Sequence, residues 1–159
     1  MSAVPSNGHG TPSIGAAPPH SIEAEQSVLG AILLSDKTHY GYIVETALRP
    51  EDFYRERHRL VFESMYALFE ENEPIDVLTV TEHLRSRNKL DAAGGPAEID
   101  ALAGAVPSVG NIARYGHIVK EHALLRNLLT TTYEIQASVH AGDTEARDIV
   151  ERAETRILE

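Results

Sequence analysis

The 159-residue sequence contains no cysteine, which excludes a disulfide framework and any thiolate metal site. No apolar run approaches the roughly 18–20 residues that a membrane span needs, and no signal peptide is recognisable. Lys and Arg number 14 against 24 Asp and Glu, so the net charge is −10. This acidic balance argues against a surface devoted to nucleic acid, which normally carries a basic stripe. We therefore expect a cytoplasmic protein that makes no membrane contact.

Motifs for phosphate binding and catalysis are also missing. There is neither G-x-x-x-x-G-K-[ST] nor G-x-G-x-x-G, so no phosphate-cradling loop is predicted. His117, Glu121 and His122 come nearest to metal-ligand spacing, but the two histidines project in different directions. They fall short of the three or four convergent ligands that zinc requires. We expect no catalytic centre, no metal and no cofactor in this chain.

The two ends of the sequence differ in character. Residues 1–19 contain no charged side chain and many Pro, Gly, Ser and Ala, a composition that predicts a disordered N-terminal arm. The last helical pattern reaches Glu159 without a C-cap glycine and stops in mid-pattern. We expect the chain to be part of a longer protein whose activity lies beyond this residue.

Apolar spacing predicts an all-α protein, a compact helical bundle over residues 20–107 followed by a long C-terminal helical hairpin over 108–159. Ser21 is placed to cap the first helix, and Pro96 is well placed as the first residue of another. We find no convincing strand. The predicted helices are 22–34, 38–48, a short turn at 50–52, 57–71, 78–88, 96–106, a long helix that follows Asn111 as its N-cap and reaches 140, and 143–159.

The long helix carries more apolar surface than its hairpin partner can cover. From Asn111 to His140 there is no proline and only one glycine, Gly116. Its apolar side chains span roughly 220° of the circumference, about twice the stripe of an ordinary surface helix. The partner helix offers one narrow stripe. Its members are Ala146, Ile149, Val150, Ala153 and Ile157.

Two arrangements would cover the excess apolar surface. The first hundred residues could pack over it in a monomer, or a second copy of the hairpin could do so in a four-helix dimer contact. The spacing of apolar residues alone does not decide between the monomer and the dimer arrangement. A separate alternative is a stand-alone helical DNA-binding regulator that uses Arg85, Arg87 and Lys89, but acidic neighbours such as Glu82 would repel phosphates.

Eight sequence pieces, in order, resemble the N-terminal domain of DnaB-type bacterial replicative DNA helicases. The likeness covers about residues 19–159. One departure is Pro96–Asp100, where relatives usually carry an aromatic-leucine pair. The pieces are 19–31 (PHSIEAEQSVLGA), 50–54 (PEDFY), 58–62 (HRLVF), 74–76 (PID), 90–91 with 94–95 (LD, GG), 106–108 (VPS), the helix positions Asn111, Ile112, Tyr115, Ile118, Val119, Leu125 and Arg126, and Ala153-Glu154.

The resemblance implies a non-catalytic collar domain whose hairpins pair between subunits of a six-membered ring, a trimer of dimers. It implies binding of the C-terminal domain of a DnaG-type primase and, in some systems, a helicase loader, with nucleic-acid contact weak or indirect. A RecA-like ATPase domain, which binds ATP and Mg, would follow a linker. We expect the hairpin interface to use Leu124, Leu125, Leu128, Leu129, Ile135, Val139, Ile149 and Ile157.

Overall fold

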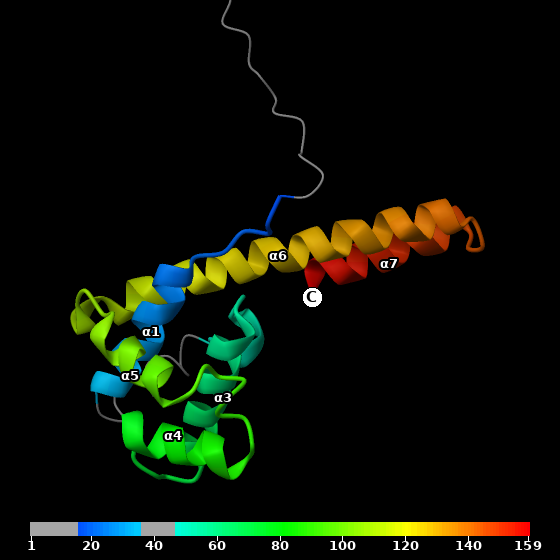
Figure 1. Ribbon diagram of the computed structural model, residues 1–159. Helices are drawn as coiled ribbons and strands as arrows, with labels where there is room; N and C mark the ends of the chain where they lie inside the picture. Colours follow the sequence, from blue (N-terminus) through cyan, green and yellow to red (C-terminus); the bar gives the residue numbers. More distant parts are fainter. Residues whose placement is uncertain (1–15, 36–46) are drawn as a thin grey trace, which may run out of the picture.

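A computed structural model describes residues 16–35 and 47–159, except for the side chain of Val109. The described residues form helices joined by turns, with no strand among them, as the sequence predicts (Figure 1). The predicted helix at 38–48 and most of the predicted arm lie outside the described residues. The elements are α1 (Ile22–Leu34), η1 (Pro50–Asp52), α3 (Glu56–Glu70), α4 (Val77–Ser86), α5 (Pro96–Gly104), η2 (Val109–Asn111), α6 (Ile112–Ala141) and α7 (Ala146–Leu158).

Local sequence signals explain several helix ends. The Ser21 hydroxyl accepts a hydrogen bond from the Ala24 N–H at 3.2 Å, so the predicted cap of α1 is confirmed. Asn111 stands at the predicted N-cap position of α6, but its side chain makes no capping bond because η2 leads directly into the helix. At the other end, Gly142 adopts φ +67°, the left-handed conformation that terminates α6.

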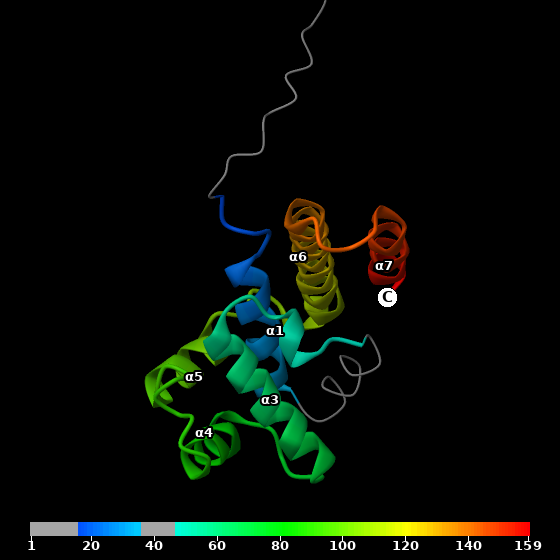
Figure 2. The same ribbon diagram turned by 90° about the vertical axis from the view of Figure 1, so that its right-hand side faces the viewer.

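The core lies where α1, α3, α4, α5 and the first half of α6 meet (Figures 1 and 2). Gly30 allows α1 to approach α5 closely, because a Cβ there would lie 2.1 Å from the Leu102 carbonyl oxygen. The Phe53 and Phe62 rings pack at 4.8 Å between centroids. Leu60 is only partly buried against this core. Several core side chains have no solvent exposure, among them Val28, Leu29, Ile32, Phe53, Val61, Met65 and Val80.

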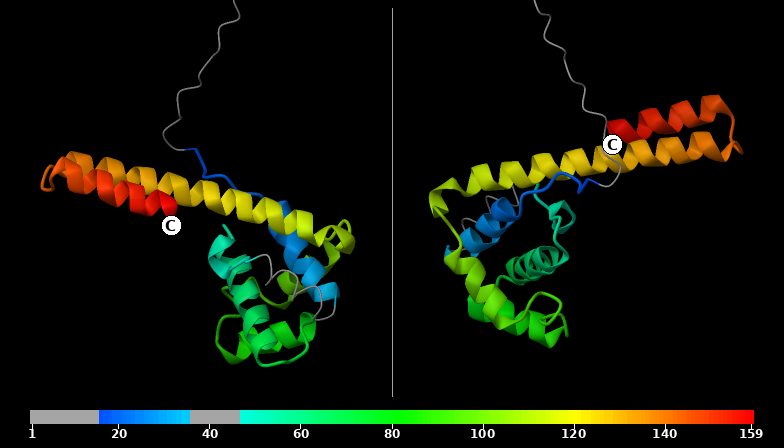
Figure 3. Two further views of the ribbon diagram at one scale, coloured as in Figure 1. Left: turned by 180° about the vertical axis from the view of Figure 1, so that it is seen from behind. Right: turned by 45° about the horizontal axis from the view of Figure 1, so that its top comes forward.

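The hairpin of α6 and α7 projects from the globule as a long arm (Figure 3). The first half of α6 packs against α1 and contributes Ile112, Val119 and Ala123 to the buried residues. The second half extends past the globule and is accompanied by α7, which runs back antiparallel to it. One continuous helix therefore belongs to both the globule and the hairpin.

Candidate oligomerisation interface

The two halves of α6 have different neighbours, which resolves part of the question that the sequence left open. Over the first half, the globule covers the apolar side chains, including Val119 and part of Ile118 from the predicted arc. From Leu124 onward, large apolar side chains remain in contact with solvent. We call this set the α6 apolar face; it consists of Leu124, Leu125, Leu128, Leu129, Tyr133 and Val139.

Part of the α6 apolar face lies on the side of the helix opposite the globule, while Leu129 and Tyr133 lie nearer the side of Val119 but further along the helix. At about 100° per residue, buried Val119 and Ala123 lie on the opposite side of the helix from Leu125 and Leu128. Leu124 is 62% exposed, Leu128 49% and Val139 59%. An exposed row of large apolar residues on a projecting helix is typical of a protein–protein interface, because association removes these side chains from water.

The hairpin does not close over its own interior. An open groove of about 540 Å³ lies between α6 and α7, and the half-buried side chains of Ile135, Ile149 and Ala153 line it. Figure 2, which looks along α6, shows the two helices side by side at the edge of the molecule. On the rim of the groove, the Arg156 Nη2 lies 2.5 Å from the Glu134 Oε2. This hydrogen bond raises the pKa of the exposed Arg156 guanidinium.

The eight predicted interface residues divide into two groups. Six are exposed: Leu124, Leu125, Leu128, Leu129, Val139 and, on α7, Ile157. Ile135 and Ile149 are half-buried in the groove, where they contribute to the packing of the hairpin itself. Tyr133, 65% exposed, belongs to the same face but is not among the eight predicted residues, although it is a large apolar side chain of the same long helix.

The residues proposed for the DNA-binding alternative are largely paired with acids. Arg85 forms an ion pair with Glu82 one helical turn away. The Lys89 ammonium lies 3.6 Å from the Glu63 carboxylate. Because neighbouring carboxylates offset these charges, the group does not form a basic stripe for phosphates, and this alternative is not favoured.

Other classes of site find no support in the described part of the chain. No group of three or more His, Cys, Asp or Glu side chains there is arranged to hold a metal ion. His117 and Glu121 are exposed on α6, while His122 is half-buried. No helix among residues 16–35 and 47–159 is long and apolar enough to cross a membrane.

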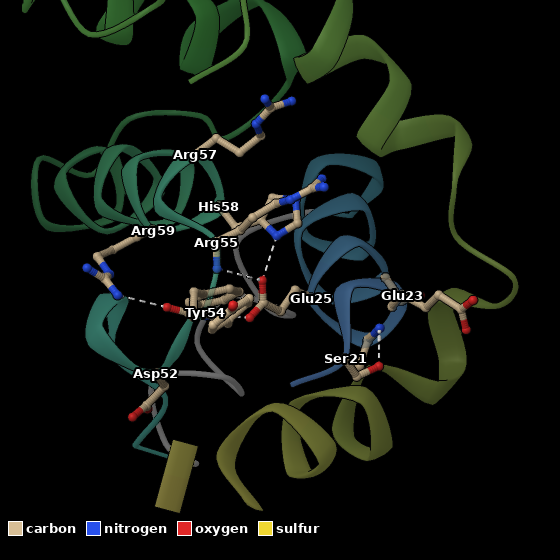
Figure 4. Close-up of polar contacts among 12 residues, drawn as sticks. Ser21, Glu23, Glu25, Asp52, Tyr54, Arg55, Arg57, His58 and Arg59 are labelled. Carbon is tan, nitrogen blue, oxygen red and sulfur yellow. Dashed lines mark hydrogen bonds and ion pairs between the residues drawn. The ribbon is translucent and has the colours of Figure 1, made fainter. Parts of the chain in front are cut away.

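Sequence reasoning missed a polar network that joins α1 to the start of α3. Buried Glu25 accepts hydrogen bonds from the Tyr54 N–H at 2.5 Å and the Arg55 N–H at 3.4 Å (Figure 4). Its other close partner is the His58 imidazole, with 2.6 Å between Nδ1 and Oε2. The partners lie about thirty residues from Glu25 in the chain, so no local pattern could have revealed them.

Comparison with known proteins places the chain in a family. Residues 17–121 match the family model described as the DnaB-like helicase N-terminal domain. The chain is 38% identical over 145 residues to the replicative DNA helicase DnaB of Pasteurella multocida, and 37% identical over 142 residues to that of Geobacillus stearothermophilus. These alignments cover 91% and 89% of this chain but only 31% of either relative.

Solved structures agree with the sequence relatives. The crystal structure of the N-terminal domain of DnaB helicase from Mycobacterium tuberculosis superposes with a TM-score of 0.84 at 38% identity, covering 90% of this chain and all of that one. A DnaB-like replicative helicase, solved in a study of its interactions with primase, shares the fold at a TM-score of 0.70 and 24% identity, over 87% of this chain and 31% of that one. The all-helical globule with its projecting hairpin thus belongs to the DnaB-like helicase N-terminal domain family.

Proposed function

We propose that this chain acts as the non-catalytic N-terminal collar of a replicative DNA helicase, and that its hairpins pair between subunits. The observation that carries the proposal is the α6 apolar face, which the globule leaves exposed on the projecting half of the helix. A two-fold contact would place the same face of each chain against its partner. The four helices of two hairpins could then bury the side chains that a single hairpin leaves exposed to solvent.

Hairpin pairing also suggests how a ring would form. Paired hairpins give a dimer, and three dimers give the six-membered collar of a ring helicase. The chain spans about a third of the length of its helicase relatives. In the whole protein, unwinding would be performed by an ATPase domain that binds ATP and Mg. The collar would in turn recruit a DnaG-type primase and, in some systems, a helicase loader. The likeness to a helicase studied with primase supports the primase partner.

Hairpin pairing is tested by measuring the molar mass of the 159-residue chain by size-exclusion chromatography with light scattering over a range of concentrations. We expect the mass to rise from monomer toward dimer as concentration increases. Leu128→Asp, which places a charge in the α6 apolar face, should keep the chain monomeric. Leu78→Asp is its matched control, because Leu78 is an exposed leucine on α4 of the globule. A monomer mass at every concentration would contradict hairpin pairing.

Primase recruitment needs a separate experiment. Calorimetric titration of the chain with the C-terminal domain of a DnaG-type primase should show saturable binding. A titration without heat at several temperatures would refute primase recruitment by this domain and leave hairpin pairing unaffected.

A further inference from the structure

Two cationic side chains of α6 reach across to the segments that precede α1 and α3. The Arg126 guanidinium donates from Nη2 to the Asp52 carbonyl at 2.6 Å and from Nη1 to the Pro19 carbonyl at 2.8 Å. The Lys120 ammonium donates to the Ala47 carbonyl at 3.1 Å and to the Asp52 carboxylate at 3.0 Å. We call these four contacts the α6 clasp. They join residues that lie between 68 and 107 positions apart in the chain.

The surroundings of Arg126 hold the clasp in place. Its guanidinium carbon lies 5.6 Å from the centre of the Tyr54 ring, and that ring stacks on His20 at 4.2 Å. Burial lowers the pKa of Arg126, while the negative charges of Glu25 and Asp52 act in the opposite direction. Glu25 in turn fixes the backbone of Tyr54, as Figure 4 shows. Of the clasp's acceptors, Asp52 lies two residues before Tyr54, whose backbone N–H is bound by buried Glu25.

The clasp is located where the hairpin leaves the globule. Among the described residues of α6, the last one buried in the globule is Ala123, less than one turn before Arg126. From Arg126, α6 continues for fifteen residues to Ala141, about 22 Å at 1.5 Å per residue. A rotation of roughly 10° at the clasp would therefore move the end of the helix by about 4 Å. Restraint at this point has its greatest effect at the hairpin tip (Figure 3).

We propose that Lys120 and Arg126 are positioning residues that fix the angle at which the hairpin leaves the globule. Apolar packing of Ile112, Val119 and Ala123 attaches α6 but allows small rotations, since such contacts have no preferred direction. Directed hydrogen bonds to fixed carbonyl oxygens remove that freedom. This inference deepens the proposed function and rests on it for its consequence: the angle would decide where the α6 apolar faces of neighbouring subunits meet.

The test measures hairpin orientation in the 159-residue chain by double electron–electron resonance. Because the sequence lacks cysteine, spin labels at Ala97→Cys on α5 and Gln136→Cys on α6, both exposed, are the only ones introduced. Labelled chain is diluted with unlabelled chain so that only distances within one molecule are recorded. We expect one narrow distance distribution for the parent chain and a broader, shifted one for Arg126→Gln and for Lys120→Gln.

Arg147→Gln is the matched control, since Arg147 is exposed on α7 and pairs with Glu151 of the same helix. Arg126→Lys keeps the charge but cannot span two carbonyl groups, so it should also broaden the distribution. An unchanged distribution in Arg126→Gln with intact helical circular dichroism would overturn the proposal. Global loss of helical signal would also overturn it, because Arg126 would then support folding rather than orientation. The molar mass of the parent chain, measured separately by light scattering, tests hairpin pairing independently of the hairpin angle.

Discussion

The most direct test of the proposed assembly is a change in the middle of the α6 apolar face. Leu128 is 49% exposed, so about half of its side chain remains to be buried in a hairpin pair. Full burial of a leucine is worth ~1.5–3 kcal/mol, and the remaining half therefore contributes ~0.8–1.5 kcal/mol. A two-fold contact contains the residue twice, which doubles the effect to ~1.5–3 kcal/mol.

These energies predict measurable shifts in affinity. Leu128→Ala should raise the dimer Kd by roughly 10- to 100-fold, since each 1.4 kcal/mol corresponds to a factor of ten. Leu128→Asp should weaken the dimer further, because closing the contact would strip water from two facing carboxylates. By the same reckoning, the half of Leu128 that is already buried contributes ~0.8–1.5 kcal/mol to the monomer, so thermal unfolding of each variant is measured beside its dimer Kd.

Sedimentation velocity over a concentration series provides the measurement. Leu78→Asp on α4, 70% exposed, introduces the same charge elsewhere and should leave the dimer Kd unchanged. If Leu128→Asp associates as strongly as the parent chain, Leu128 is not in the contact and the assignment of this face is wrong. If both aspartate variants weaken association equally, net charge is responsible and the face has no special role.

Three further predictions concern the globule and are tested by urea unfolding. Gly30→Ala should destabilise the fold by about 1–3 kcal/mol, since the new methyl group would overlap the Leu102 carbonyl; an unchanged midpoint would mean that α1 and α5 separate freely. Glu25→Ala should cost about 3–5 kcal/mol because it leaves His58 and two backbone N–H groups without their acceptor; a smaller loss than Gly30→Ala would contradict this ranking. Burial, and then neighbouring cations such as Arg87, lower the pKa of His83 below 6.5. As pH falls below 6.5, His83 therefore binds a proton more readily in the unfolded chain than in the folded one, and the free energy of unfolding should decrease. His83→Gln should flatten this pH dependence.

Much of the helical architecture follows from local sequence. The bounds of α1 match the predicted 22–34, because Ser21 supplies the cap and every residue from Ser27 to Leu33 is buried in the globule. The η1 turn matches as well, with Pro50 as its first residue. The remaining predicted helices in the described part differ at their ends, and α7 begins three residues later than expected, at Ala146. Helix ends depend on a few capping bonds, so they are the least determined feature of a sequence pattern.

The long helix shows where pattern analysis reaches its limit. An arc of roughly 220° indicates that more than one surface covers the helix, but it does not say where along the helix each surface lies. In the structure the two are arranged in series: α1 covers Val119, and Leu128 remains exposed beyond it. The globule therefore covers the first part of the helix, and the exposed part beyond it is where we propose that a second hairpin packs.

By itself, the sequence determined the helical class, most of the core, the excess of apolar surface and the family. These depend on the spacing of residue types along the chain, which helical geometry converts directly into faces. Only the tertiary structure decided which leucines stay exposed, that Glu25 holds the start of α3, and that Arg126 and Lys120 join α6 to distant carbonyl groups. Those contacts join residues 29 to 107 positions apart, and the spacing of one segment carries no information about which distant segment will pack against it.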